Sequence, residues 1–154
     1  MIELNSLKQQ VYQHCLEQVT QKADRLQQDM AAIQASANEE TKSTAGDKYE
    51  TARAMAMIEK ENLSKQLGEA MKQVQVLQQV NPEQSHQKAA LGALVYTTDG
   101  KYYYLSISLG PTKVNGHTIL VISPVSPIGQ LLLGKAAGNQ FQFNRQTMTI
   151  KAIA

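Results

Sequence analysis

Residues 12–37 have the sequence YQHCLEQVTQKADRLQQDMAAIQASA, in which apolar side chains recur at alternating spacings of four and three. The recurring residues are Tyr12, Leu16, Val19, Ala23, Leu26, Met30, Ile33 and Ala37. This is the heptad spacing of a coiled-coil seam, and Gln, Lys and Glu, which favour helix, fill many of the other positions. The pattern predicts a long helix that packs its seam against another helix.

A second seam follows in the sequence, and Lys60 interrupts it. Its apolar members are Ala52, Ala56, Leu63, Leu67, Ala70, Val74 and Leu77. This helix is expected to start near Asp47 and to stop before Asn81, because Pro82 disfavours helix in the residue before it. The polar residues 38–46 between the seams favour a turn. We therefore predict an antiparallel helical hairpin over residues 1–80, whose helices of about 32 residues reach roughly 48 Å.

The rest of the chain differs in composition. All four prolines and seven of the nine glycines lie after residue 81. Lys and Arg number ten against twelve Asp and Glu in residues 1–88, but five against one in residues 89–154. This change predicts two parts with different roles. We expect residues 81–91 to be a linker and residues 92–154 to form a second, smaller domain.

This second domain is predicted to be a sheet of about five strands with one short helix. Asp99-Gly100 is a strong hairpin signal between two strands, and Gly134 is a plausible C-terminal cap of a helix that follows Pro127. Strands are expected at residues 93–98, 101–108, 117–123, 140–144 and 147–153, and the helix at residues 128–133. The fold class is therefore α+β, with a helical hairpin followed by a small β-rich domain.

Composition limits the possible functions. The chain has 154 residues and a net charge of +2, too weak to indicate a wrap of nucleic acid or a membrane-surface patch. Its one cysteine, Cys15, fits a reducing compartment, and the three histidines show no zinc-ligand spacing. No apolar run approaches ~20 residues and no secretion signal is visible. We expect a cytoplasmic protein that makes no membrane contact and is not itself an enzyme, since no nucleophile–base pair is recognisable.

Acidic residues gather at the predicted bend, residues 38–50, which we call the tip. Asp47 and Glu50 are three positions apart, so both carboxylates can face one way and help to hold Mg²⁺ or orient a water molecule. The same pair also fits a capping box that simply starts a helix, and spacing alone favours capping. Behind the tip, Met55 and Met57 either pack the end of the hairpin or contact a partner protein.

Two motifs of this chain resemble those of the bacterial Gre-type transcription elongation factors. Residues 46–52, GDKYETA, are similar to the Gly-Asp-x-x-Glu-Asn-Ala motif at the tip of the Gre coiled coil. Residues 122–139, ISPVSPIGQLLLGKAAGN, resemble the family's C-terminal segment, with Ser-Pro-Ile, a short Leu-rich helix and Gly-Lys. Length, order of the parts and the hairpin agree over essentially the whole chain.

The resemblance implies an antiparallel coiled coil followed by an FKBP-like domain, and RNA polymerase as the partner. Ser126, Pro127 and Ile128 would dock at the rim of the polymerase secondary channel. The coiled coil would enter the channel and bring Asp47 and Glu50 to the RNA 3′ end. There the two carboxylates would share the Mg²⁺ of the polymerase active site, so that the polymerase cleaves backtracked RNA. The factor would be a monomer and would bind no cofactor when alone.

Two alternatives stay open, because the sequence departs from the family after Glu50. The family usually continues with Asn-Ala-Glu-Tyr, whereas this chain has Thr51-Ala52-Arg53-Ala54 followed by the apolar Met55-Ala56-Met57. One alternative is an inhibitory regulator of the same fold that enters the secondary channel without stimulating cleavage. The other is a generic interaction module with a coiled-coil arm.

Overall fold

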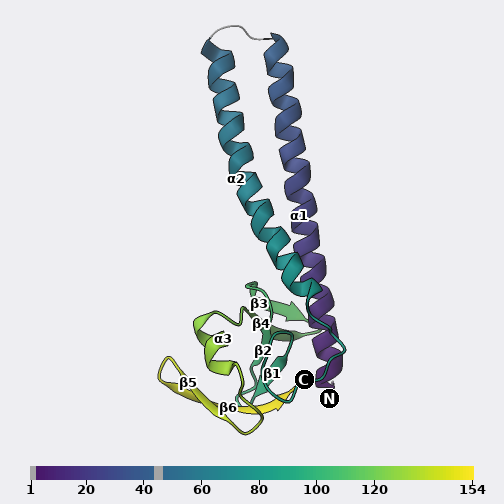
Figure 1. Ribbon diagram of the computed structural model, residues 1–154, viewed down its shortest axis with the longest axis vertical. Coiled ribbons are helices and arrows are strands. Elements are labelled where there is room, and N and C mark those ends of the chain that lie inside the picture. Colours follow the sequence, from purple (N-terminus) through teal and green to yellow (C-terminus); the bar gives the residue numbers. More distant parts are fainter. Residues whose placement is uncertain (1–2, 44–46) are drawn as a thin grey trace. The chain divides into compact units, whose positions relative to one another are not determined.

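The computed structural model describes the backbone of residues 3–43 and 47–154, and the side chains of residues 3–38 and 50–154. Two long helices come first in the chain, and a small sheet with one short helix follows (Figure 1). The elements are α1 (Leu4–Ser43), α2 (Asp47–Gln78), β1 (Leu94–Thr97), β2 (Tyr102–Leu105), β3 (Gly110–Val114), β4 (His117–Ile122), α3 (Pro127–Leu132), β5 (Gln140–Phe143) and β6 (Gln146–Ile153). The predicted α+β class is confirmed.

Contacts divide the chain into two compact units. Unit 1 consists of Met1–Leu16 and Gln75–Ala154, and unit 2 of Glu17–Val74. Unit 1 therefore combines the first turns of α1 and the end of α2 with the sheet. The predicted division into residues 1–80, 81–91 and 92–154 stays a prediction.

Unit 2 is a helical hairpin in which α1 and α2 run antiparallel, side by side (Figure 1). Its buried apolar side chains, Val19, Leu26 and Ala70, all belong to the predicted seams. Lys60, which interrupts the second seam, is half-buried and donates a hydrogen bond of 2.7 Å from Nζ to Oε1 of Gln34 on α1. A polar side chain at a seam position is thereby satisfied across the hairpin, which fixes the register of the two helices.

In unit 1, the described residues form one six-stranded sheet in the order β3-β4-β2-β1-β6-β5. β1 is antiparallel to both β2 and β6, while β2 is parallel to β4. The predicted hairpin at Asp99-Gly100 is confirmed, since Gly100 has a φ of 86° and Leu94–Thr97 pairs with Tyr102–Leu105. The predicted closing hairpin corresponds to β5 and β6, and the predicted short helix to α3.

The prediction of about five strands missed β3. This strand pairs antiparallel with β4 through a two-residue turn at Asn115-Gly116, where φ is 51° and 79°. Two successive positive φ angles are typical of the type I′ turn that joins hairpin strands, and Asn-Gly is its preferred sequence. Pro111 obscured the strand, but β3 lies at the edge of the sheet, where proline is tolerated.

The sheet of unit 1 has a hydrophobic core on one face and the first turns of α1 on the other. The core contains Ala89, Val95, Tyr103, Leu105, Leu132, Phe141, Met148 and Ile150. From α1, Leu7, Val11 and Cys15 are at most 1% exposed. Tyr12 donates a hydrogen bond of 3.0 Å from its hydroxyl to the carbonyl oxygen of Leu77, near the end of α2. The start of α1 is thus an integral part of unit 1.

Candidate functional site

The tip of the hairpin carries the acidic pair predicted from the sequence. α2 begins at Asp47, as expected, and Glu50 lies in its first turn with an exposed side chain. The side chain of Asp47 lies outside the described residues, as do Gly46 and the side chains of Glu39 and Glu40. Both the capping role and the metal-binding role of the pair therefore stay predictions.

Two carboxylates supply only part of the six-oxygen shell that Mg²⁺ requires. Among the residues that the structure describes, no three His, Cys, Asp or Glu side chains are grouped so that they could hold a metal ion. If Asp47 and Glu50 act on Mg²⁺, water molecules or groups of a partner would complete its shell. A metal shared with another active site therefore stays a prediction.

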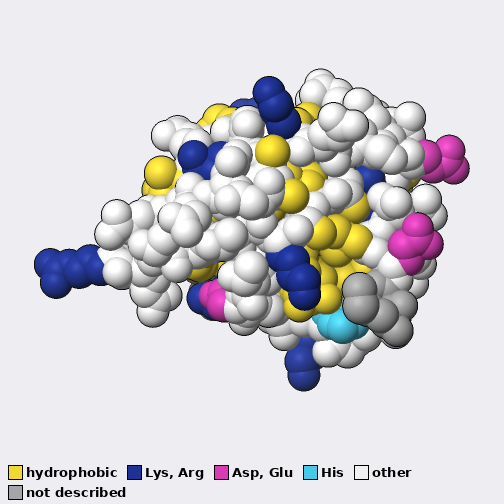
Figure 2. All heavy atoms as spheres, turned by 90° about the horizontal axis from the view of Figure 1, so that it is seen from below, with side chains coloured by type: hydrophobic (Ala, Val, Ile, Leu, Met, Phe, Trp, Pro, Cys, Tyr) yellow, Lys and Arg dark blue, Asp and Glu magenta, His cyan; other side chains and the backbone are white. Residues whose placement is uncertain are grey.

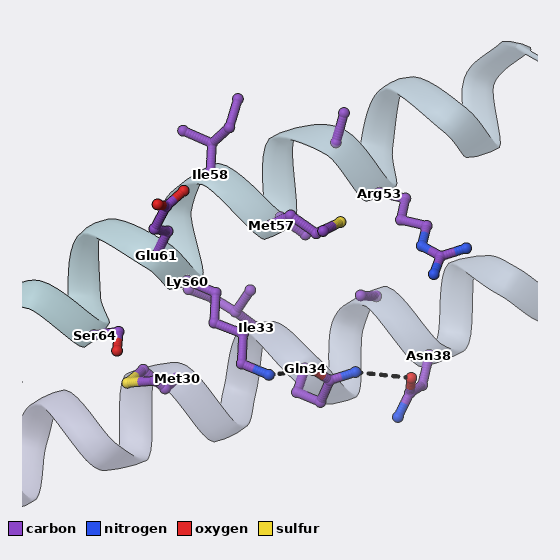
Figure 3. Close-up of a pocket in the computed structure, with 13 residues that line it drawn as sticks. Met30, Ile33, Gln34, Asn38, Arg53, Met57, Ile58, Lys60, Glu61 and Ser64 are labelled. Carbon is purple, nitrogen blue, oxygen red and sulfur yellow. Dashed lines mark hydrogen bonds between the residues drawn. The ribbon is translucent and has the colours of Figure 1, made fainter.

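Behind the tip, a groove of about 910 Å³ lies between α1 and α2 (Figure 3). It is lined by Met30, Ile33, Gln34, Ala37, Asn38, Arg53, Ala54, Ala56, Met57, Ile58, Lys60, Glu61 and Ser64. A second hollow of about 440 Å³ shares Ile33, Ala37 and Ala56 with it. Alanines at these seam positions are too small to fill the space between two helices, so the hairpin is incompletely packed here.

Large apolar side chains beside this groove are exposed to solvent. Met55 is 66% exposed, Met57 62% and Ile58 60%. Such exposure does not fit the interpretation in which these methionines pack the end of the hairpin, and a contact with a partner protein stays a prediction. In Figure 3, Met57 extends along the groove and Ile58 points away from α1.

A row of polar side chains follows one edge of the groove. Lys60 donates to Gln34 as described, and Nε2 of Gln34 donates to Oδ1 of Asn38 at 3.1 Å (Figure 3). The sequence analysis singled out Lys60 as the break in the second seam, but not its partners, because Gln34 and Asn38 lie on the other helix and belong to no motif. The row lies on one side of the groove, whose lining also includes the polar residues Arg53, Glu61 and Ser64.

The predicted docking residues lie at the start of α3 in unit 1. Ser126 is the N-cap: its hydroxyl accepts a hydrogen bond of 3.1 Å from the Gly129 amide and donates one of 2.6 Å to the Ser123 carbonyl. Pro127 is exposed at the first helical position, and Ile128 is half-buried against the core. The Ser126 hydroxyl is therefore used in hydrogen bonds within the loop. Of the three predicted docking residues, Pro127 is the exposed one.

Exposed apolar residues lie in this loop and along α3. Val125 is 76% exposed, Leu131 37% and Leu133 42%, whereas Leu132 is fully buried. The available signal was the run of three leucines, since so short a helix can bury only one face. Together with Pro127, they are exposed apolar residues within and next to α3.

Burial holds two ionisable groups of unit 1, Cys15 and Tyr104, in their protonated forms. Burial raises the pKa of Cys15 to about 12, so its thiol stays protonated and unreactive. Burial also raises the pKa of Tyr104, and the neighbouring Cys15 and Tyr12 add to the effect. Tyr102 points to the opposite face of the sheet from Tyr103, and the centre of its ring lies 4.6 Å from that of Tyr96 on the adjacent strand. These aromatic contacts stabilise the sheet.

The comparisons with known proteins leave the family open. No family model matches this chain, and a search of curated proteins finds no similar sequence. None of the helices in the described part of the chain carries an apolar stretch sufficient to cross a lipid bilayer. On the face shown in Figure 2, Lys and Arg side chains are scattered instead of gathered in one patch.

Proposed function

We propose that this chain is a Gre-type regulator of RNA polymerase, acting in the cytoplasm as a monomer. In this proposal unit 1 binds the rim of the secondary channel and the hairpin enters the channel. Asp47 and Glu50 then share the Mg²⁺ of the polymerase, which cleaves the 3′ end of backtracked RNA. The protein supplies carboxylates and position, and the polymerase performs the hydrolysis.

One observation carries this proposal: a helix with an exposed carboxylate in its first turn begins at the bend of a long helical hairpin. Residues 17–43 of α1 alone extend roughly 40 Å at 1.5 Å per residue. That length exceeds what a core of a small protein needs, but it suits a probe that reaches into a channel. The sequence resemblance supplies the identity of the channel, and nothing in the comparisons tests it.

The apolar surface around Pro127 supports the docking part of the proposal. Val125, Leu131 and Leu133 expose apolar side chains around a loop that three hydrogen bonds of Ser123 and Ser126 hold in place. A preorganised apolar surface loses little conformational entropy when it binds. Ser126 contributes by shaping this surface, while Pro127 and Ile128 are expected to contact the polymerase or support the contact.

A cleavage assay tests the proposal. Stalled, backtracked elongation complexes of the cognate polymerase are mixed with Mg²⁺ and the wild-type protein or the Asp47→Ala/Glu50→Ala variant. Wild type is expected to shorten the RNA, and the variant to bind the polymerase without shortening it. Loss of a helix cap costs about 1 kcal/mol, so the hairpin is expected to survive even where Asp47 has that role. Asp24→Ala/Glu69→Ala removes two exposed carboxylates away from the tip and serves as the matched control.

A second candidate function is a channel regulator that does not stimulate cleavage. The exposed Met55, Met57 and Ile58 favour it, because the family has polar residues directly after the tip carboxylates. Slower elongation without RNA shortening, with wild type and with the tip variant alike, would support this function. No effect on the polymerase in any assay would leave the generic interaction module as the remaining candidate.

A further inference from the structure

Within the described residues, the sheet of unit 1 is open at both ends, and its two edge strands differ. β3 and β5 are the first and last strands of the sheet (Figure 1). Each of them pairs with a neighbour on one side alone, so half of its backbone groups point away from the sheet. Proteins commonly protect such edges with proline or lysine, because an unprotected edge accepts a further strand.

β3 is protected at both of its outward positions. Val114 pairs with His117 across a two-residue turn, and the pair that closes such a turn is hydrogen-bonded. Along an antiparallel strand, residues that bond with the partner strand alternate with residues whose N–H and C=O point away. Counting from the turn, the outward residues are Pro111, which has no N–H, and Lys113, whose charged side chain is exposed.

β5 lacks this protection. The N–H of Ile150 on β6 donates to the carbonyl oxygen of Asn139 at 2.9 Å, so the next residue, Gln140, faces away from β6. The same alternation turns Gln142 outward. Both glutamines are exposed, and the strand, QFQF, contains neither proline nor a charged residue. Apart from the ladder with β6, none of the described residues forms a backbone hydrogen bond with either glutamine.

The charge around β5 is of one sign. Residues 100–154 contain five Lys and Arg but no Asp or Glu. Arg145 is exposed in the turn that joins β5 to β6, and Lys135 lies between α3 and β5. Two copies paired through β5 would bring these positive surroundings together, which opposes association. An acidic segment, in contrast, is complementary to them.

A strand added beside β5 would have one apolar face. Phe141 and Phe143 point to the core face of the sheet, and α3 contacts β5 on this face. Leu131 and Leu133, at the end of α3, are exposed. Because the side chains of a strand alternate between the two faces, every second residue of an added strand lies on the side of α3. Apolar residues suit those positions.

We propose that β5 is a docking edge, to which an extended, acidic segment of a partner protein adds a further strand. The backbone of this segment bonds with the outward N–H and C=O groups of Gln140 and Gln142. Its apolar residues lie on the side of Phe141, and its carboxylates lie near Arg145. Extended peptides bind other sheet edges in this way. The proposal does not depend on the proposed function, because neither the tip nor the loop before α3 takes part.

A synthetic peptide tests strand addition to the full chain. The probe is the heptapeptide Glu-Val-Glu-Val-Glu-Val-Glu, in which charge and apolar side chains alternate. Amide hydrogen exchange measured by NMR is expected to slow at Gln140 and Gln142 when the peptide binds, and to stay unchanged at Lys113 on the other edge. A peptide of the same composition with its three valines adjacent has lost the alternation and should bind less well, as should the version with lysine in place of glutamate.

Two pairs of variants test the backbone and charge contributions separately. Gln142→Pro removes an outward N–H at an edge position where proline is tolerated, and should weaken peptide binding by about tenfold. Gln142→Ala keeps the N–H and should bind like the wild type. Arg145→Asn removes a positive charge but fits the φ of 65°, and should weaken binding severalfold. Lys113→Asn, at the other edge, should not. Thermal unfolding shows whether each variant is folded, and the exchange experiment needs none of them.

Several results would overturn the proposal. Gln140 and Gln142 amides that stay unprotected at millimolar peptide would do so, as would equal affinity for the peptide without alternation. Unchanged binding by a folded Gln142→Pro variant would exclude backbone pairing at this edge. Protection of both glutamines without peptide, rising with protein concentration, would show that a second copy occupies the edge instead of an acidic partner.

Discussion

At the scale of single residues, unit 1 contains ionisable side chains that are fully or partly buried. Lys8 is 1% exposed, and its Nζ donates a hydrogen bond of 2.5 Å to the carbonyl oxygen of Gln84. Burial lowers the pKa of Lys8, which reflects the cost of keeping an ammonium group out of water. His86 lies near this charge. The hydrogen bond of Lys8 joins the first turns of α1 to the segment that leads into the sheet.

His86 should make the stability of unit 1 depend on pH. Burial, and then the charge of Lys8, lower the pKa of His86 below its usual 6.5, although a backbone hydrogen bond with Ala154 opposes the shift. The unfolded chain then binds the proton more readily than the folded one, so the free energy of unfolding falls as pH drops below 6.5. Urea unfolding at about pH 7.5 and about pH 5.5 measures this loss, and His86→Gln should reduce it. An equal loss in both proteins would contradict the assignment to His86.

Gly129 should not tolerate a side chain. A Cβ atom at this position would lie 2.1 Å from the carbonyl oxygen of Ser123, so the loop before α3 would have to move. We expect Gly129→Ala to cost about 1–3 kcal/mol, as overpacking does elsewhere. Gly68→Ala is the control: no atom lies within 4 Å of its Cβ, and alanine favours helix by up to about 1 kcal/mol. The midpoint of thermal unfolding should fall for Gly129→Ala and rise for Gly68→Ala. A Gly129→Ala variant as stable as the wild type would contradict the expected clash with Ser123.

At the scale of elements, the residues that hold the loop before α3 in place differ from those that are exposed on its surface. Ser123 and Ser126 hold the loop through their side chains, and Leu132 anchors the helix in the core. Val125 and Leu131 are exposed beside them. The loop can therefore be altered at its surface without loss of its structure.

Substitutions at Val125 and Ser126 should affect different properties. Val125→Glu places a charge on the exposed apolar surface and should reduce polymerase binding while the thermal midpoint stays unchanged. Ser126→Ala removes the N-cap and should lower stability by about 1 kcal/mol, with a smaller effect on binding. Binding affinity and thermal unfolding of both variants measure the difference. Full binding by Val125→Glu would exclude this surface as the docking site.

Strong local signals made most elements predictable from the sequence. The seams predicted both long helices, and Asp99-Gly100 predicted the first hairpin. β3 was missed because Gly110 and Pro111 resemble a loop, and the Asn115-Gly116 turn signal was not used. The groove behind the tip was not predictable from either seam alone, since it depends on which alanines of two helices meet. For the candidate site, the sequence predicted that a helix begins near Asp47, but not that the Ser126 hydroxyl is occupied by hydrogen bonds within the loop.

At the scale of the whole molecule, the two units differ in how their contacts are distributed along the sequence. Unit 2 is one continuous segment, whereas unit 1 joins residues from both ends of the chain. Leu7 and Val11 come from α1 and Leu77 from the end of α2, and each is at most 1% exposed. The sheet therefore gains part of its apolar burial from residues that lie before the hairpin in sequence.

Removal of the helices should unfold the sheet. A fragment of residues 81–154 lacks several fully buried side chains, each of which contributes about 1.5–3 kcal/mol, against a total stability of about 5–15 kcal/mol for a typical domain. A chain in which a short Gly/Ser linker replaces residues 17–74 keeps those side chains and should fold. Amide spectra of both fragments measure the difference. A well-folded 81–154 fragment would instead support the predicted boundary near residue 80.

The pairing of β1 with β6 has a consequence for how the protein emerges from the ribosome. Val95 pairs with Ile153, so the centre of the sheet cannot close until almost the whole chain has been translated. The hairpin needs only residues 17–74 and can form much earlier, because its contacts are local. During synthesis, Leu7 and Val11 therefore still lack their final packing partners when the hairpin has already formed. The nascent chain passes through a stage with a finished hairpin and exposed apolar residues at its start, the stage at which chaperones would bind it.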